Sequence, residues 1–326
     1  MRFLLPTGIG DTTWALTKAA AIAGRLGDGL VVIAIACDDP GDVVQVRALE
    51  YVRRFPFVAS AEMYRSGAVL KPGPHADARG RYRYLDDGPW RDGLYALMPN
   101  APLERGERLE SWFPDDPIDW TITRQWANTA EETQLAATIR GQLGPFAVIY
   151  PGPEGGNLGD GHNRGSLWRP AQWAQLAVAL RGLGLAVVAI GASYDWSYWR
   201  NFVLPALKCV DPSGRLVHNF VGELPIGKTL ALIRAAALGV YYQSGLGVWS
   251  AFEGIPTAMF WRPEGNSICA GKYLSFDERM ATAWVPPAEL DAGRYLPCIY
   301  TRTDVPAIAA WAQRCASNLP QPPPPA

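Results

Sequence analysis

The first residues with a chemical signature lie near the N-terminus, in the segment LLPTGIGDTTWAL. The apolar run Arg2 to Leu5 predicts a short strand. The turn after it contains Gly8, Gly10 and Asp11, and a helix is expected to follow. The carboxylate of Asp11 suits a general base that takes a proton from an attacking hydroxyl group. The alternative is that Asp11 only caps the helix. The dinucleotide-binding pattern GxGxxG is incomplete, because position 13 is Thr.

A second segment, LGVYYQSGLGVWSAFEGIPTAMFW, predicts a strand over Leu238 to Tyr242, followed by a turn, a helix and another strand. The turn contains Gln243, Ser244, Gly245, Leu246 and Gly247. Ser244 is suited to cap a helix that starts near Leu246. Backbone N–H groups and the helix dipole favour a phosphate at such a helix start, and the two glycines let a ligand approach the backbone. The alternative is a Gly-Ser turn that binds nothing.

Glycines mark three further strand ends. The loop PGPEGGNLGDGHNRGSLWRP begins after the strand predicted over Phe146 to Tyr150, and two more predicted strands end at IGA and VGEL. Carboxyl ends of parallel strands meet at one edge of a sheet, so these residues predict a crevice for a nucleotide-sized ligand. The residues assigned to it are Gly152, Gly191, Gly222, Glu223 and Leu224, together with Arg164 as a phosphate ligand. His162 has no visible partner for a triad or metal site, and we expect it to be structural or solvent-facing.

Helical and strand-like patterns alternate along most of the chain, which predicts an α/β fold with parallel sheets. A predicted helix ends at Gly144, and the alternation then starts again. We therefore expect an N-terminal domain over 1–145 and a C-terminal domain over 146–302. A last helix is expected within 303–318, and a disordered Pro-rich tail over 319–326.

The pattern is irregular from 67 to 117, where Pro, Gly, Arg, Asp and Tyr dominate. A long irregular stretch inside a compact protein is usually functional or mobile. We interpret it as a set of acceptor-binding loops, with a solvated insertion as the alternative.

Composition narrows the function classes. The chain has 326 residues, 48% of them hydrophobic, and a net charge of -1, and it has no run of like charge typical of a nucleic-acid-binding arm. Its 5 cysteines form no CxxC pair, so neither a metal site nor a disulfide framework is expected. No signal peptide and no apolar run of roughly 18 residues is present, which predicts a soluble, cytoplasmic protein. Several of the 13 tryptophans lie in polar contexts and are suited to stack on a sugar or base.

Several segments occur in an order that resembles glycosyltransferase family nine, the heptosyltransferase-like enzymes. The resemblance rests on GD in the first turn, then YPG, WRPAQWAQLAVALRGLGLAVVAIGA and VGELPIGKTLALIRAAALGVYYQSGLGVWSAFEGIPTAMFW. It covers about 148–261 and roughly the first 35 residues. It implies the GT-B fold, with two Rossmann-like domains facing across a cleft. The C-terminal domain would bind a nucleotide-diphosphate sugar and the N-terminal domain the acceptor, and the last helix would cross back to the N-terminal domain.

The resemblance also implies inverting, metal-independent transfer without a cofactor, with Asp11 as general base. The chain departs from the family motif Asp-(Ser/Thr)-Gly-x-x-His, because Gln243 and Val248 replace its acid and histidine. Ser166 replaces a common lysine, and Arg164 is available as a substitute for its charge. The backbone of the motif is retained, so donor binding is expected, but the sugar and base preferences of heptosyltransferases are not carried over. Arg262, just after a strand end, is expected to touch the donor.

Three alternatives stay open at this point. The acceptor is a saccharide or, because 79–91 is rich in Arg, Tyr and Trp, a nucleic-acid base. The second alternative is an inactive module that only binds a nucleotide sugar, because the acid and the histidine of the family motif are replaced. A Rossmann dehydrogenase is disfavoured by the incomplete glycine pattern.

Overall fold

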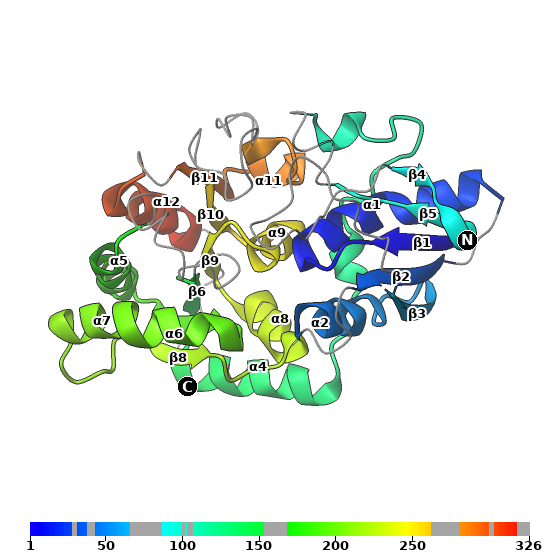
Figure 1. The fold of residues 1–326 in the computed structure, drawn as a ribbon. Coiled ribbons are helices and arrows are strands. Elements are labelled where there is room, and N and C mark those ends of the chain that lie inside the picture. Colours follow the sequence, from blue (N-terminus) through cyan, green and yellow to red (C-terminus); the bar gives the residue numbers. More distant parts are fainter. Residues whose placement is uncertain are drawn as a thin grey trace. The chain divides into compact units, whose positions relative to one another are not determined.

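A computed structural model of the chain describes residues 1–27, 31–37, 43–65, 87–99, 102, 107–152, 168–261, 281–299 and 303–317. These residues form two compact units. Unit 1 contains the described residues of Met1–Asn128, Ser244–Glu253 and Arg262–Pro287; unit 2 contains those of Thr129–Gln243, Gly254–Trp261 and Ala288–Ala326. Each unit has its own sheet (Figure 1). The predicted domain limits at residues 145 and 302 stay predictions.

The sheet of unit 1 has five strands in the order β3-β2-β1-β5-β4. The strands are β1 (Arg2–Leu5), β2 (Val31–Cys37), β3 (Val58–Arg65), β4 (Gly88–Pro89) and β5 (Leu94–Ala96). Both neighbours of β1 are parallel to it, and β4 is antiparallel to β5. The helices of unit 1 are α1 (Ile9–Arg25), α2 (Val43–Val52) and α9 (Gly245–Phe252), with short 3₁₀ turns η1 (Arg91–Gly93), η2 (Leu109–Ser111) and η3 (Ile122–Gln125).

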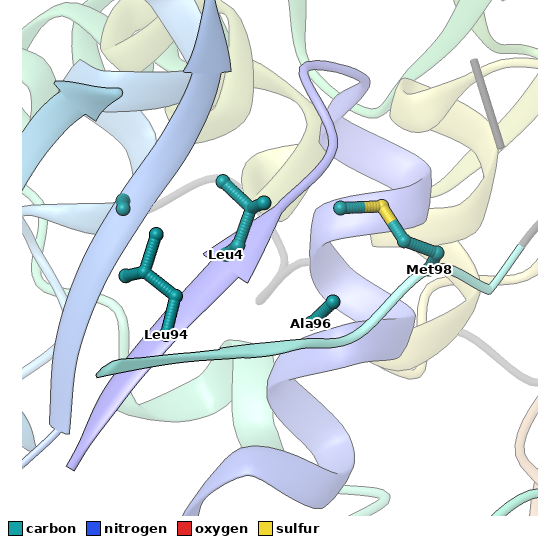
Figure 2. Close-up of a cluster of buried hydrophobic side chains, with 5 residues drawn as sticks. Leu4, Leu94, Ala96 and Met98 are labelled. Carbon is teal, nitrogen blue, oxygen red and sulfur yellow. The ribbon is translucent and has the colours of Figure 1, made fainter. Parts of the chain in front are cut away.

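One face of this sheet is packed by short aliphatic side chains. Leu4 of β1 pairs in register with Ala34 of β2 on one side and with Ala96 of β5 on the other. Leu94 and Met98 complete the buried cluster, as Figure 2 shows. Because β1 is central and buried, the turn that follows it is anchored at the middle of the sheet.

The sheet of unit 2 has six strands in the order β11-β10-β9-β6-β7-β8, and all its neighbouring strands are parallel. The strands are β6 (Phe146–Tyr150), β7 (Ala186–Gly191), β8 (His218–Val221), β9 (Leu238–Tyr242), β10 (Thr257–Trp261) and β11 (Tyr295–Ile299). Strand order reverses between β6 and β9, since the chain builds outward from β6 in both directions. A reversal of this kind opens a ligand crevice at the carboxyl ends of the strands.

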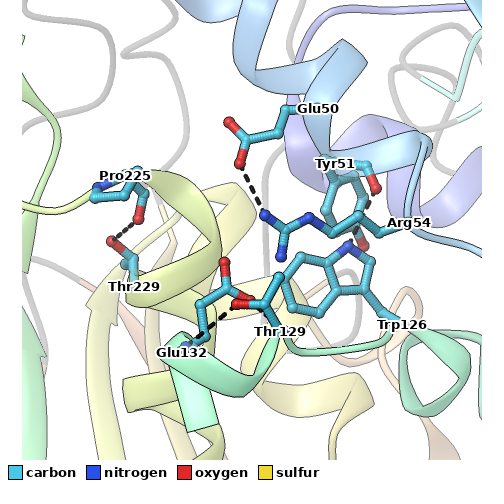
Figure 3. Close-up of polar contacts among 8 residues, drawn as sticks. All are labelled: Glu50, Tyr51, Arg54, Trp126, Thr129, Glu132, Pro225 and Thr229. Atoms are coloured by element: carbon cyan, nitrogen blue, oxygen red, sulfur yellow. Dashed lines mark hydrogen bonds and ion pairs between the residues drawn. The ribbon is translucent and has the colours of Figure 1, made fainter. Parts of the chain in front are cut away.

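The helices of unit 2 are α4 (Ala130–Leu143), α5 (Pro170–Gly182), α6 (Trp196–Tyr198), α7 (Leu204–Val210), α8 (Ile226–Ala235), α11 (Pro287–Asp291) and α12 (Val305–Ser317). The 3₁₀ turn η5 (Ser193–Asp195) precedes α6, and the π-helix η6 (Trp199–Val203) links α6 to α7. A reciprocal cap begins α4: the Glu132 amide donates to Thr129 Oγ1 at 3.2 Å, and the Thr129 amide donates to Glu132 Oε2 at 2.8 Å (Figure 3). Helix α12 packs against α5, and its predicted crossing to the N-terminal domain stays a prediction.

The predicted α/β alternation is confirmed, and the strands expected at 2–5, 146–150 and 238–242 are present with those bounds. The expectation that 67–117 is irregular throughout is wrong, because β5 lies in it and pairs with β1. A three-residue strand is too short to show a periodic pattern in the sequence. Strand β11 also escaped prediction, since its Pro297 argues against a strand on local grounds.

Candidate functional site: two helix starts and a strand edge

The first turn of α1 presents Asp11. The helix begins at Ile9, with Gly8 as its N-cap residue, so Asp11 is the third helical residue. Asp11 is therefore not the N-cap residue itself, and the alternative that it only caps the helix from the first turn stays a prediction. A Cβ atom at Gly8 would lie 2.9 Å from Asp11 Oδ2, so the carboxylate occupies space that only glycine leaves empty. An acidic group in the first turn is also stabilised by the positive end of the helix dipole.

Two threonines hold this turn in place. Thr12 Oγ1 donates to the carbonyl oxygen of Pro6 at 3.0 Å, which ties the helix to the turn before it. Thr13 Oγ1 lies 2.7 Å from the carbonyl oxygen of Ile9 and 2.9 Å from the hydroxyl of Tyr51 in α2. Both threonines are fully buried. Asp11 is thus carried on a rigid turn rather than on a loose loop.

Helix α9 begins as expected. Ser244 is its N-cap residue, and its Oγ accepts a hydrogen bond from the Gly247 amide at 3.2 Å. Gly245 and Leu246 form the start of the first turn and are partly exposed. Val248, which stands where the resembling family has histidine, is buried and has a packing role.

The starts of α1 and α9 meet within unit 1. A Cβ atom at Gly245 would lie 2.6 Å from the Gly10 nitrogen, and one at Gly10 would lie 3.1 Å from Gly245 Cα. The two predicted groups, Gly8 to Asp11 and Ser244 to Gly247, are therefore brought together by the fold. Two positive helix ends at one place form a favourable environment for an anion.

Aromatic side chains fix α9 in unit 1. Trp249 is fully buried and meets Trp126 edge to face, with ring centroids 6.3 Å apart. Trp126 Nε1 donates to the Tyr51 carbonyl oxygen at 3.1 Å, and the Arg54 guanidinium lies 4.8 Å above the Trp126 ring (Figure 3). Since Tyr51 also contacts Thr13, one network supports the first turn of α1 and the body of α9.

Two further segments cover α1. The buried Lys18 ammonium donates to the carbonyl oxygens of Phe113 and Asp116, at 3.0 and 2.6 Å. Burial lowers the pKa of Lys18, and the nearby Asp116 acts in the opposite direction. Trp14 Nε1 donates to the Trp284 carbonyl oxygen at 2.9 Å, so residues near 284 also pack on this helix. These contacts keep α1 in place beneath the site.

In unit 2, the predicted glycines lie at the carboxyl ends of adjacent strands. Gly152 follows β6, Gly191 ends β7, and Gly222 follows β8. Gly222 has φ of 77°, which a residue with a side chain rarely adopts, and its amide donates to the Gly191 carbonyl oxygen at 2.9 Å. Glu223 is exposed and Leu224 partly exposed beside it. Gln243 follows β9 on the same edge, where its amide donates to the Phe260 carbonyl oxygen at 2.9 Å.

Sequence reasoning missed Asp195, a buried carboxylate between two of these glycines. Its Oδ2 accepts from the Tyr150 hydroxyl at 3.1 Å and from the Ala192 amide at 2.8 Å. Cβ atoms at Gly152 and Gly191 would lie 2.7 Å from its Cγ and 3.3 Å from its Cβ. The position of Asp195 four residues beyond a glycine-ended strand was the available signal. These glycines make room for a protein side chain.

The prediction that several tryptophans stack on a sugar or base stays a prediction, but most of those in the described chain are buried in the fold. In the described chain ten are buried: Trp14, Trp112, Trp126, Trp168, Trp173, Trp199, Trp249, Trp261, Trp284 and Trp311. Trp196 is 39% exposed, beside Gly222. Several of them pack against aromatic rings that lie far away in the sequence.

Several predicted residues lie outside the described chain, namely Arg164, Ser166, Arg262, His162 and most of 79–91. Within the described residues, no group of three or more His, Cys, Asp or Glu side chains is arranged to hold a metal ion. No helix among them combines the length and apolarity that crossing a membrane requires.

The chain resembles solved glycosyltransferases over nearly its whole length. E. coli ADP-heptose lps heptosyltransferase II matches with a TM-score of 0.57 and 15% identity, over 97% of this chain and 98% of that one. A glycosyl transferase family 9 structure from Veillonella parvula matches with a TM-score of 0.59 and 10% identity, over 98% and 97%. E. coli heptosyltransferase WaaC with ADP matches with a TM-score of 0.54 and 10% identity, over 97% and 100%.

The fold is that of the family-nine glycosyltransferases. This finding confirms the predicted fold class and the predicted structural resemblance. No protein-family model and no curated protein sequence matches the chain. At this low identity, the family-nine fold is established by structure, and the activity must be argued from the residues.

Proposed function

We propose that the chain is a glycosyltransferase that moves a sugar from a nucleotide-diphosphate sugar to a hydroxyl acceptor. The observation that carries the proposal is the meeting of the α1 and α9 helix starts at Gly10 and Gly245, with Asp11 on the first turn of α1. The family-nine fold supports it, because solved structures with this fold are heptosyltransferases with ADP or ADP-2-deoxy-2-fluoro heptose.

In the proposed reaction, the acceptor oxygen attacks the anomeric carbon from the face opposite the leaving group, so the configuration inverts. Asp11 accepts the hydroxyl proton while the new C–O bond forms. The bond from the anomeric carbon to the diphosphate breaks, and the nucleoside diphosphate leaves with the electron pair. Backbone N–H groups at the start of α9 stabilise its negative charge without a metal ion.

Donor binding in this proposal uses backbone more than side chains. Ser244 shapes the first turn of α9 by capping it. The amides of Gly245 and Leu246, in the same turn, have no acceptor within the helix and are proposed to donate to the diphosphate. The replacement of the family histidine by Val248 leaves this backbone arrangement intact.

The test begins with a thermal-shift panel of ADP, UDP, GDP and their sugar conjugates. A ligand that binds only the folded state raises its stability, so one nucleotide should stabilise the protein selectively. The selected nucleotide sugar is then used to measure release of the nucleoside diphosphate with saccharide and nucleic-acid acceptors.

Asp11→Asn should lower this release by at least about 100-fold while nucleotide binding persists, because the general base is lost. The matched control is Asp115→Asn, at an exposed position of unit 1. Unchanged turnover in Asp11→Asn would remove the base assignment. Nucleotide binding with no turnover in the wild type, for any acceptor class, would instead favour an inactive binding module.

A further inference from the structure

Helix α9 lies between β9 and β10 in the sequence but packs against α1 within unit 1. The closest approach is backbone to backbone, at the first turn of each helix. A Cβ atom at Gly245 would lie 2.6 Å from the Gly10 nitrogen and 2.8 Å from Ile9 Cβ. Both distances are shorter than real Cβ contacts, so this spacing of the helices requires glycine at position 245.

Crowding of helix α1 occurs at this end of the helix and not at the other. At Gly10, a Cβ atom would lie 3.1 Å from Gly245 Cα and 3.4 Å from Val248 Cγ2. At Gly24, near the other end of α1, a Cβ atom would meet nothing within 4 Å. The space left by the absent side chain of Gly245 is therefore directed at α1. This differs from the sequence-based reason for the glycine, which was close approach of a ligand.

The face of α9 that carries Gly245 is also held further along the helix, because positions 245, 249 and 252 are spaced i, i+4 and i+7. Trp249 is buried against Trp126, and Phe252 packs against Trp120 with ring centroids 5.7 Å apart. These contacts anchor the rest of this face of α9 within unit 1, and the glycine pair sets how closely its first turn approaches α1. The separation of the two helix starts is thus fixed at the glycine contact, with the end of α9 anchored by aromatic packing.

We propose that Gly10 and Gly245 are positioning residues that set the distance between the Asp11 carboxylate and the diphosphate-binding start of α9. This inference rests on the proposed function, and it concerns the spacing that the two glycines set, apart from the proposed contact of the α9 backbone amides with the diphosphate. Both act through the spacing of the two helices. Displacement at the anomeric carbon requires that the base, the acceptor and the donor lie at fixed distances from one another. A misplacement of about 1 Å can lower the rate about 100-fold.

The test substitution is Gly245→Ala. Its methyl group falls where the α1 backbone lies, so α9 must move by most of an ångström to reach an ordinary contact of 3.4 Å. The kcat for nucleoside diphosphate release should fall about 100-fold, while affinity for the nucleoside diphosphate stays close to that of the wild type. Gly10→Ala should cause a smaller fall in kcat, because its contacts are less severe.

Gly24→Ala is the matched control, with the same chemical change on α1 and no crowding. It should leave kcat unchanged, and alanine is the better helix former. Circular dichroism and a melting curve establish that each variant folds. If Gly245→Ala does not fold, Gly10→Ala decides the question by the same separation of kcat from affinity.

Two results would overturn the positioning role: unchanged kcat in the folded glycine variants, or a parallel loss of affinity and kcat that restores the ligand-approach explanation. Failure of the proposed function is distinct from either. It is seen when the wild type itself releases no nucleoside diphosphate from any donor in the panel, and the positioning role is then overturned with it.

Discussion

Glycines cluster at predicted sites in both units, but the two clusters exist for different physical reasons. In unit 1, Gly10 and Gly245 allow two helix starts to touch through their backbones. In unit 2, Gly152 and Gly191 surround the side chain of Asp195. A glycine at a strand end therefore does not by itself indicate a ligand. What the glycine faces in the fold decides its role.

The largest effect that would test this contrast is on stability, at the buried carboxylate of unit 2. Asp195→Ala leaves the Tyr150 hydroxyl and the Ala192 amide without the acceptor that they use. The free energy of unfolding should fall by about 3 kcal/mol, the cost of stranding two buried donors. Urea denaturation measures it, with Asp115→Ala at an exposed position as control.

A loss below about 1 kcal/mol would show that Asp195 does not organise this edge. A double-mutant cycle with Gly152→Ala sharpens the result, because a Cβ atom at Gly152 would lie 2.7 Å from Asp195 Cγ. Gly152→Ala should therefore cost less in the Asp195→Ala background than in the wild type.

The second effect is on turnover, at the first turn of α1 in unit 1. Gly8→Ala places a methyl group 2.9 Å from Asp11 Oδ2, and the carboxylate can turn away more easily than the backbone can move. Nucleoside diphosphate release should fall by about 10-fold, or about 1.4 kcal/mol in barrier, with little loss of stability. Steady-state rates and melting curves of the same samples provide the measurement.

A large loss of stability in Gly8→Ala would contradict this account, because it would mean that backbone and not the Asp11 side chain fills the space. Equal turnover in Gly8→Ala and wild type would mean that the orientation of Asp11 does not matter to the reaction.

The smallest effect is a pH dependence in unit 2. Burial, and secondarily the positive charge of Arg181, lowers the pKa of His218 in β8. The unfolded chain then binds a proton more readily than the folded one, so stability falls as the pH drops below about 6.5, the ordinary histidine pKa. His218→Gln should reduce this acid loss slightly, as measured by melting temperatures between about pH 7.5 and 5.5. A steeper acid loss in His218→Gln would reverse the assigned sign.

Local patterns in the sequence predicted much of the fold. The apolar runs of β1, β6 and β9 predicted the first and last residues of these strands, and Ser244 predicted the start of α9. The pattern failed at β5, whose three residues form a strand because β1 and β4 offer them hydrogen-bond partners. It also did not show which tryptophans are buried, since burial depends on residues distant in the sequence.

For the candidate site, the residue types could be chosen from the sequence but not their surroundings. Asp11 and the start of α9 were identified as separate features, more than 200 residues apart. No local signal showed that Gly10 and Gly245 would touch, or that Asp195 would fill the space beside Gly152. Arg164, Ser166 and Arg262 stay predictions, since they lie outside the described residues.

The sequence by itself determined where the helices and most strands form, because hydrophobic periodicity and capping act over a few neighbouring residues. It also determined which turn carries a carboxylate and which carries a capped, glycine-rich helix start. Only the tertiary structure decided that these two turns share one unit and that their glycines face each other. Side-chain packing and backbone contact join residues far apart in the chain, and these contacts cannot be predicted from the residues next to a position in the sequence.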